Sequence, residues 1–177
     1  MKSILIHNKA FKLYIRAEEI KVAISKIATR MNDELRDKKP LFIAVLNGSF
    51  VFAGDLLREL NLECEISFVK LSSYEGVSST GKVKELIGLD RDIQGRTIVV
   101  IEDIVDTGVT LDMLYNQLRA CGPAEIRTAT LLFKPAAYTK NIKVDYPAME
   151  VPNDFLVGYG LDYDGLGRNL GDIYKAE

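Results

Sequence analysis

The sequence predicts an α/β fold in which a mostly parallel sheet is flanked by helices. Segments with strand character alternate along the chain with segments of helical, amphipathic spacing. The five residues 97–101, TIVVI, are all β-branched, which is typical of a strand buried on both faces of a parallel sheet. The chain has 177 residues, enough for one domain with a substantial core and too few for two ordinary domains. We therefore expect a single domain over residues 1–177.

The first helix and the two strands that follow it carry clear sequence signals. Residues 16–35 place apolar side chains at helical spacing, and Pro40 follows the end of that pattern. Residues 41–46 read as a buried strand, and a short loop leads to a helix from residue 50 to about 60. In the next strand, to about residue 71, Cys64, Ile66 and Phe68 alternate with polar residues, which predicts one buried face.

The second half of the chain continues the alternation of strands and helices. After the strand at residues 97–101, Leu111, Leu114 and Leu118 keep helical spacing. Gly122 and Pro123 end that helix, and residues 126–133 form another apolar strand.

Composition excludes several classes of protein. Hydrophobic residues make up 47% and charged residues 27%, as in ordinary globular proteins. The net charge of −2 leaves no basic footprint for nucleic acid, and no apolar stretch approaches the roughly 20 residues of a membrane span. The N-terminal residues show no secretory signal. Cys64 and Cys121 stand alone in apolar segments, so we expect buried, reduced thiols in a cytoplasmic protein.

The loop after the strand at residues 97–101 has the layout of an anion site. Two acids, Glu102 and Asp103, are followed by the polar run 106–110, DTGVT, and then by a helix. Backbone N–H groups of such a loop and of the first helical turn can bind a phosphate. The acids would repel that phosphate, so they are expected to address ribose hydroxyls or a metal. The alternative is a solvated turn in which Thr107 or Thr110 caps the helix.

Four loops should meet at one edge of the sheet. Ligands of parallel sheets bind at the carboxyl ends of the strands. The segments expected there are Asn47-Gly48, residues 72–82, residues 102–110 and Lys134.

Three of the remaining features have two interpretations. Residues 72–82, with two glycines and a single Tyr74, are either a polar hairpin loop or a lid that closes over a site. Lys134 is either a surface lysine at a strand end or a donor to a carbonyl oxygen of a ligand. Phe155 and Leu156 are either core residues or part of a binding segment, and Asp162 either a turn residue or a ligand-binding one.

Two motifs resemble known ones. Residues 99–111, VVIEDIVDTGVTL, resemble the phosphoribosyl-diphosphate motif of type I phosphoribosyltransferases. Residues 155–163, FLVGYGLDY, match the FxVGYxLDY pattern of the hypoxanthine-guanine phosphoribosyltransferases. The resemblance extends from about residue 41 to 170. It implies the type I phosphoribosyltransferase fold, with a core at about 12–150 and a small hood formed by residues 1–11 and 151–177.

The same resemblance implies a reaction. The 5-phosphoribosyl group of 5-phosphoribosyl 1-diphosphate would pass to N9 of hypoxanthine or guanine, giving IMP or GMP and diphosphate in purine salvage. Mg²⁺ would be the cofactor, and a homodimer or homotetramer the assembly. We expect small-molecule substrates only, with no nucleic acid or membrane as partner.

The resemblance also assigns roles to individual residues. The catalytic residues would be Asp106 as general acid/base, Tyr74 on the lid and Arg168 at the diphosphate. The phosphoribosyl group would be bound by Glu102, Asp103, Asp106, Thr107, Gly108, Val109 and Thr110. The diphosphate would be bound by Asn47, Gly48, Ser73 and Arg168. The purine would be bound by Lys134, Phe155, Leu156 and Asp162, and the metal by Glu102, Asp103 and Asp162.

Asn47 departs from the family pattern, which usually has a basic residue there. This suggests weaker binding of diphosphate or a different subunit contact, which Lys70 would compensate in part. In the family, the peptide bond before this position can be cis. Two other functions compete with the main one: a non-enzymatic regulator that senses phosphoribosyl diphosphate, and a transferase for adenine, orotate or uracil. An ammonium at Lys134 would face the amino group of adenine unfavourably, which favours 6-oxopurines.

Overall fold

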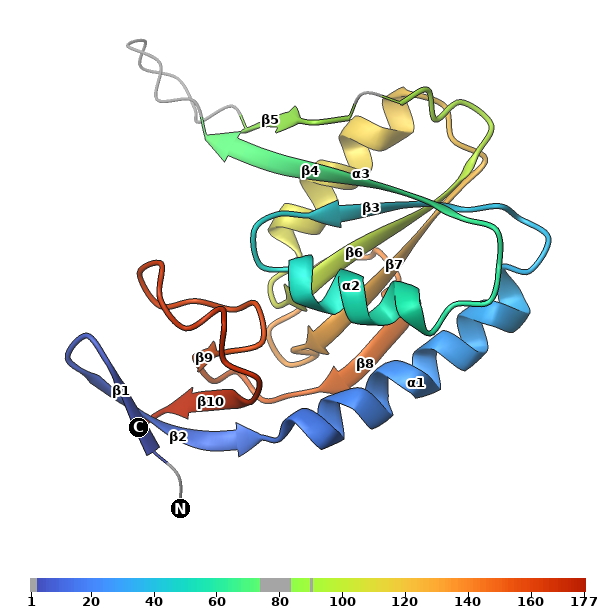
Figure 1. The fold of residues 1–177 in the computed structure, drawn as a ribbon. Coiled ribbons are helices and arrows are strands. Elements are labelled where there is room, and N and C mark those ends of the chain that lie inside the picture. The colour runs from blue at the N-terminus through green and yellow to red at the C-terminus, as the bar shows by residue number, and fades with distance from the viewer. Residues whose placement is uncertain (1–2, 74–83, 90) are drawn as a thin grey trace, which may run out of the picture.

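The computed structural model describes residues 3–73, 84–89 and 91–177. Within these residues the chain forms a six-stranded sheet of order β5-β4-β3-β6-β7-β8 and a four-stranded sheet of order β1-β2-β10-β9. Strands β4, β3, β6, β7 and β8 run parallel to one another, and β5 pairs antiparallel with β4. The predicted fold class, a mostly parallel sheet flanked by helices with a small hood, is confirmed (Figure 1).

The elements have the following bounds. The strands are β1 (Ser3–Ile6), β2 (Lys9–Ile15), β3 (Leu41–Val45), β4 (Glu65–Ser73), β5 (Lys84–Ile87), β6 (Thr97–Val105), β7 (Glu125–Phe133), β8 (Tyr146–Glu150), β9 (Leu156–Val157) and β10 (Ile173–Ala176). The helices are α1 (Ala17–Glu34), α2 (Phe50–Arg58) and α3 (Val109–Ala120).

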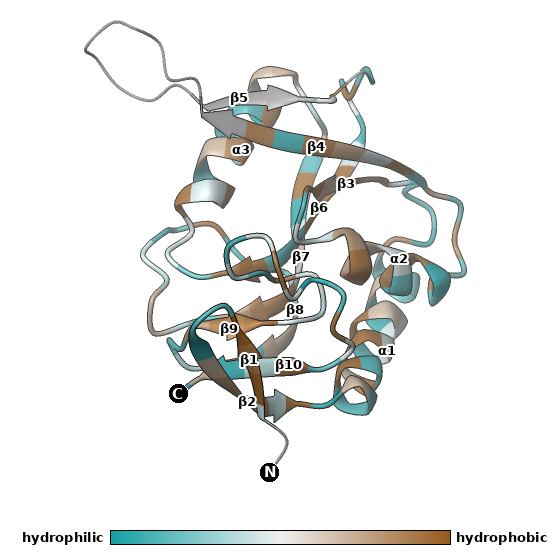
Figure 2. Cartoon of the chain, turned by 60° about the vertical axis from the view of Figure 1, so that its left-hand side comes forward, coloured by the Kyte–Doolittle hydropathy of each residue, from teal (hydrophilic) through white to brown (hydrophobic). Residues whose placement is uncertain are grey.

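Helices cover both faces of the parallel sheet. The apolar stripe of α1, including Ile20, Ile24 and Ile27, packs in one core cluster together with α2. Leu111 and Leu114 of α3 pack in a second cluster on the opposite face. Figure 2 shows the central strands as largely hydrophobic between these layers. The sheet thus has two cores, as expected for parallel strands buried on both faces.

The prediction for β4 was wrong in part. Phe68 is 43% exposed, whereas Ser67 and Val69 on the other face of the strand are buried. Since α2 packs over β3 and β6, it leaves Phe68 uncovered. The expected burial of the two thiols was also wrong: Cys64 and Cys121 are both exposed. Cys64 precedes the first residue of β4, and Cys121 follows the last residue of α3.

The antiparallel sheet is the hood. It pairs the N-terminal hairpin β1–β2 with β10 and β9 from the C-terminal part of the chain. Its own small core contains Phe11, Val157 and Tyr174. Strand β2 runs to Ile15 and leads directly into α1. In Figure 1 the hood lies on the side toward which the carboxyl ends of β3, β6 and β7 point.

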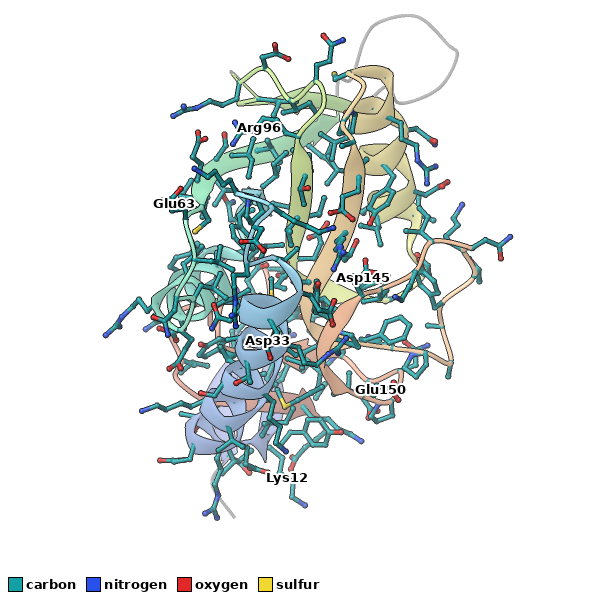
Figure 3. All side chains as sticks on the ribbon, turned by 90° about the vertical axis from the view of Figure 1, so that its right-hand side faces the viewer. Lys12, Asp33, Glu63, Arg96, Asp145 and Glu150 are labelled. Carbon is teal, nitrogen blue, oxygen red and sulfur yellow. The ribbon has the colours of Figure 1, made fainter. Side chains whose placement is uncertain are left out.

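At the end of the sheet opposite the hood, side-chain hydrogen bonds link a helix to two strands. Glu34, at the end of α1, accepts hydrogen bonds from Arg127 (2.9 Å) and from the Tyr146 hydroxyl (2.8 Å). These bonds tie α1 to β7 and β8. Figure 3 looks onto this end, with Asp33 of α1 and Asp145 before β8 labelled. In the described part of the chain, no helix has both the length and the apolar character needed to cross a membrane.

Candidate active site

The two adjacent acids lie inside strand β6. The sequence predicted them just after the strand, but Glu102 still pairs with Thr130 of β7, and Ile104 pairs with Leu132. The strand therefore continues to Val105 and buries the Glu102 carboxyl group. Glu102 Oε1 has no hydrogen-bond partner among the described residues. Burial, with the nearby charge of Asp103, raises the pKa of Glu102 well above its ordinary value. A buried carboxyl oxygen without a donor is a natural acceptor for a ligand hydroxyl or a cation.

Asp103, on the other face of β6, is the centre of a close contact between three segments. A Cβ atom at Gly48 would overlap the Asp103 carboxylate, and a Cβ atom at Gly160 would overlap the backbone oxygen of Gly48. Asp103 Oδ1 accepts a hydrogen bond from the backbone N–H of Ile104 (2.8 Å). Burial raises the pKa of Asp103, against the opposing effects of backbone N–H groups and of the Arg168 charge. The β3–α2 loop, the end of β6 and the hood thus meet at one point.

The β3–α2 loop has the backbone form that the family resemblance allowed. The peptide bond between Leu46 and Asn47 is cis. Asn47 is exposed, whereas Gly48 is buried. The loop therefore presents its backbone toward Asp103 at the predicted edge of the sheet.

The loop between β6 and α3 is arranged around one glycine. Gly108 has φ +80° and occupies the N-cap position of α3, with no side-chain hydrogen bond capping the helix. The alternative in which Thr107 or Thr110 caps α3 is therefore wrong. Asp106 is exposed, and its Oδ1 accepts a hydrogen bond from the backbone N–H of Thr107 (2.5 Å). The N–H groups in the first turn of an α-helix lack intrahelical partners, so the start of α3 is suited to binding an anion.

Lys134 lies beside that loop. Its backbone N–H donates to the carbonyl oxygen of Val105 (2.9 Å), the residue before Asp106. Its side chain is only 8% exposed, and its Nζ donates to Asn153 Oδ1 at 3.4 Å. The interpretation of Lys134 as a surface lysine is therefore wrong. A buried ammonium whose amide partner is neutral retains donors for a ligand oxygen.

Phe155 and its neighbours form an aromatic cluster in the hood. Its ring lies 5.7 Å from the Tyr163 ring and 6.2 Å from the Phe11 ring, and it remains 47% exposed. Lys9 Nζ lies 5.1 Å from the centre of the Phe155 ring. Leu156, by contrast, is buried in β9. An exposed ring held by other aromatic rings is suited to stacking on a planar ligand.

Asp162 and Arg168 bind each other in the hood. Arg168 Nη2 lies 2.7 Å from Asp162 Oδ1, and Arg168 Nη1 donates to the Gly160 carbonyl oxygen at 2.7 Å. The other carboxylate oxygen of Asp162 accepts a hydrogen bond from the backbone N–H of Gly165 (2.7 Å). The charges of Arg168 and Asp162 both act on the pKa of Asp103, so this pair belongs to the same electrostatic environment as the β6 acids.

Sequence reasoning missed residues that connect these parts. The Tyr159 hydroxyl donates to the Asp55 carboxylate and so ties the hood to α2. Tyr159 has φ +49° and its pKa is raised by burial and by this bond. Asn153, the partner of Lys134, was also missed. No periodicity marks such contacts, since each joins residues distant in sequence.

Part of the predicted site lies outside the described residues. Tyr74 and the proposed lid, apart from the backbone of the last residues of β4, lie outside the described residues. Ser73 ends β4, and its side chain lies outside the description. Among the described residues no group of three or more His, Cys, Asp or Glu side chains is arranged to hold a metal. The predicted set of Glu102, Asp103 and Asp162 therefore does not form such a group on its own. Magnesium is commonly bound by one or two carboxylates together with substrate phosphates, so the Mg²⁺ site stays a prediction.

Comparison with known proteins places this site in context. A model of the phosphoribosyl transferase domain matches residues 14–164. A hypoxanthine-guanine phosphoribosyltransferase of Mycobacterium avium is 40% identical over 166 residues, covering 90% of this chain and 82% of the relative. One of Bacillus subtilis is 39% identical over 160 residues, covering 90% and 89%. The crystal structure of a hypoxanthine phosphoribosyltransferase of Staphylococcus aureus superposes with a TM-score of 0.86 at 29% identity, covering 94% of this chain and 91% of that one.

Proposed function

This chain belongs to the phosphoribosyl transferase family and is an enzyme of its hypoxanthine-guanine phosphoribosyltransferase group. From that premise we propose that it transfers the 5-phosphoribosyl group of 5-phosphoribosyl 1-diphosphate to N9 of hypoxanthine or guanine, with Mg²⁺. The products would be IMP or GMP and diphosphate. The physiological role would be purine salvage.

One observation carries this proposal. The buried ammonium group of Lys134 belongs to a residue whose backbone is hydrogen-bonded to Val105, immediately before Asp106. A donor for a purine oxygen and an acid beside a phosphate loop therefore lie on neighbouring strand ends. A single nucleotide could contact both.

Lys134 would select the base. Its N–H donors suit the oxygen at C6 of hypoxanthine and guanine, whereas adenine presents an amino group there. A buried donor that faces another donor rejects the analogue strongly. Phe155, with 47% of its surface exposed, would stack on the same ring. Backbone carbonyl oxygens near Leu156 and Asp162 would accept hydrogen bonds from the 2-amino group of guanine.

Asp106 would accept the proton that the base loses at N7 during transfer. Its exposed carboxylate is oriented by the backbone N–H of Thr107, so it can exchange that proton with solvent. Thr107 to Thr110, at the N-terminus of α3, would bind the 5′-phosphate. The substitution at C1′ would proceed with inversion of configuration through a transition state of oxocarbenium character. Negative charge then develops on the departing diphosphate and must be stabilised. Arg168, whose guanidinium offers a rigid set of donors, would serve that need together with the backbone of Gly48.

The acids of β6 would bind the sugar. Glu102 has a buried oxygen without a donor, and vicinal ribose hydroxyls would supply one. Asp103 and Asp162 would hold the magnesium ion, directly or through water. Such a cation would explain why carboxylates lie close to a phosphate that they would otherwise repel. When bound, the ion supplies positive charge to the diphosphate and helps to fix its orientation.

We also propose a cytoplasmic homodimer or homotetramer. The exposed apolar side chains Phe50 and Phe68, on α2 and β4, support a contact between copies of the chain. Asn47, in place of the basic residue of the family pattern, would weaken the binding of diphosphate relative to relatives that have the basic residue.

An acceptor panel tests the function. Purified protein is incubated with magnesium and phosphoribosyl diphosphate, and with hypoxanthine, guanine, xanthine, adenine or uracil in turn. We expect nucleotide from hypoxanthine or guanine and little from adenine or uracil. Binding of phosphoribosyl diphosphate without product from any base would favour the regulator. Product from adenine alone would overturn the role of Lys134.

A further inference from the structure

The connection between β7 and β8 contacts the loop at residues 107–110, to which the proposed function assigns the 5′-phosphate. We propose that Tyr138, Thr139 and Lys140 are positioning residues that set the backbone of that loop and so determine affinity for the 5′-phosphate. The proposal rests on the proposed function only in taking that phosphate as the ligand of the loop. Figure 1 shows the β7–β8 connection near the start of α3.

Thr139 orients one peptide of the loop. The carbonyl oxygen of Thr107 accepts hydrogen bonds from the Thr139 backbone N–H (3.3 Å) and from Thr139 Oγ1 (3.1 Å). A trans peptide is planar, with its C=O and N–H directed oppositely. When the Thr107 carbonyl turns toward Thr139, the N–H of Gly108 in the same peptide is turned away from Thr139. Thr139 therefore fixes the direction of the Gly108 N–H on the side of the loop opposite Thr139, the side to which we assign the phosphate.

Tyr138 determines which residue can stand at position 108. A Cβ atom on Gly108 would overlap the Tyr138 ring, and the φ of +80° also favours glycine. The ring itself is held at both ends. Its hydroxyl donates to the Ile142 carbonyl oxygen (2.6 Å), and its ring packs edge-to-face with the Phe133 ring, with the ring centres 5.3 Å apart. Gly108 thus lies directly against the Tyr138 ring, whose position is fixed, and this contact restricts the backbone conformations of the loop.

Lys140 compensates a charge that would otherwise oppose phosphate binding. Asp112 lies in the first turn of α3, where its carboxylate would repel an anion at the helix start. Lys140 Nζ lies 3.1 Å from Asp112 Oδ2, and the two side chains are 31% and 36% exposed. An ammonium group close to the carboxylate offsets most of its field at the phosphate position.

The same connection begins at the base-selecting lysine. Lys134 donates its backbone N–H to Val105, and Ala137 donates its backbone N–H to the Lys134 carbonyl oxygen (3.1 Å), which closes a turn. Two residues later, Thr139 reaches Thr107. The segment therefore links the base site to the phosphate site through backbone bonds, so that the distance between them is set by one short stretch of chain.

Thr139→Val tests the proposal, because valine keeps the shape of threonine and removes the hydroxyl. We expect the dissociation constant for GMP, measured by calorimetry, to rise roughly 2- to 12-fold, the factor equivalent to one neutral hydrogen bond. The KM for phosphoribosyl diphosphate should rise similarly, while the KM for hypoxanthine stays nearly constant. Thr139→Ser should restore wild-type binding. Thr29→Val is the matched control, since Thr29 Oγ1 makes the same kind of bond, to the Ser25 carbonyl oxygen, on the distant helix α1.

Lys140→Gln supplies a second, independent readout. Loss of the ammonium exposes the phosphate to the charge of Asp112, so affinity for GMP should fall most at low ionic strength and approach the wild-type value as salt is added. Equal affinity of wild type and Thr139→Val for GMP would overturn the inference, as would a parallel rise in both KM values. A wild-type protein that binds neither GMP nor phosphoribosyl diphosphate would instead overturn the proposed function, so the two failures are distinguishable.

Discussion

Replacing Lys134 by methionine tests most directly the proposed role of this residue in selecting the base. Methionine keeps an unbranched apolar side chain, one atom shorter than that of lysine, and removes the charged donor. Lys134 is 8% exposed, so water cannot take over the lost bond. The described contacts of its Nζ comprise one long bond, 3.4 Å to Asn153, which leaves most of its donor capacity for the ligand.

The magnitude follows from the kind of bond that is lost. A hydrogen bond to a charged group contributes about 1.5–3 kcal/mol. Each 1.36 kcal/mol is tenfold in rate, so kcat/KM for hypoxanthine should fall roughly 10- to 150-fold. The KM for phosphoribosyl diphosphate should not change, because the side chain of Lys134 is assigned to the base and not to the sugar phosphate. Discrimination against adenine should narrow, because the donor that opposes its amino group is gone.

Steady-state kinetics with hypoxanthine and adenine, each over a range of concentrations, measure these effects. Lys143→Met is the matched control: Lys143 stands on the same β7–β8 connection, but its side chain is 81% exposed and pairs with Asp145. That variant should keep wild-type kinetics. If Lys134→Met used hypoxanthine as well as wild type does, or lost adenine activity in proportion, Lys134 would not select the base.

Three further predictions concern the acid, the glycine and the end of the sheet opposite the hood. Asp106→Asn should lower kcat ~10²–10⁴-fold, the usual contribution of general acid–base catalysis, with nearly unchanged affinity for phosphoribosyl diphosphate by calorimetry; unchanged turnover would remove Asp106 from the mechanism. Gly108→Ala should weaken binding of GMP at least tenfold (on the order of 1.4 kcal/mol), because a Cβ atom would overlap the Tyr138 ring at a positive φ; wild-type affinity would contradict the close contact. The Tyr146 hydroxyl and neighbouring arginines lower the pKa of Glu34 below 4.5, so its contribution to stability is present above that pH and is lost as pH falls through the folded-state pKa. Glu34→Gln should therefore lower the free energy of unfolding in urea near neutral pH and make it fall less steeply below pH 4.5; an identical pH dependence in both proteins would argue against the bond.

Local patterns predicted the elements that are stabilised by one strongly apolar face. Helix α1 was expected at residues 16–35 and is observed over Ala17–Glu34, because its apolar stripe is long and regular. Strand β4 was the failure. The alternation at Ile66 and Phe68 correctly indicated a strand but not which face α2 would cover. Which residues of a strand next to the sheet edge are buried depends on the position of a helix, and that position is a tertiary property.

The end of β6 shows the same limit at the site itself. Polar residues Glu102 and Asp103 suggested that the strand had ended, since acids are rare in buried strands. Backbone pairing with β7 nevertheless continues past them, to the pair Val105 and Phe133. The acids can lie within the strand because β7 continues to supply its backbone hydrogen bonds. A carboxyl group on a strand is also held more rigidly than one on a loop. The residue types were therefore predicted correctly, while their secondary structure was not.

The motifs come together because two glycines, Gly48 and Gly160, have no side chain. The resemblance assigned Gly48 to the diphosphate and said nothing of Gly160 beyond its place in a motif. In the structure a side chain at either position would overlap its neighbour: the Asp103 carboxylate in one case and the Gly48 backbone in the other. Each glycine thus permits a close approach between segments more than fifty residues apart in the chain. Because a glycine has no side chain, such an approach produces no hydrophobic or charge pattern in the sequence. Tyr159, next to Gly160, adds a hydrogen bond to Asp55 that holds the same approach from the side of α2. It follows that the hood positions the β3–α2 loop, to which we assign the diphosphate, so substitutions at Gly160 should impair the use of phosphoribosyl diphosphate even though the motif around it is assigned to the purine.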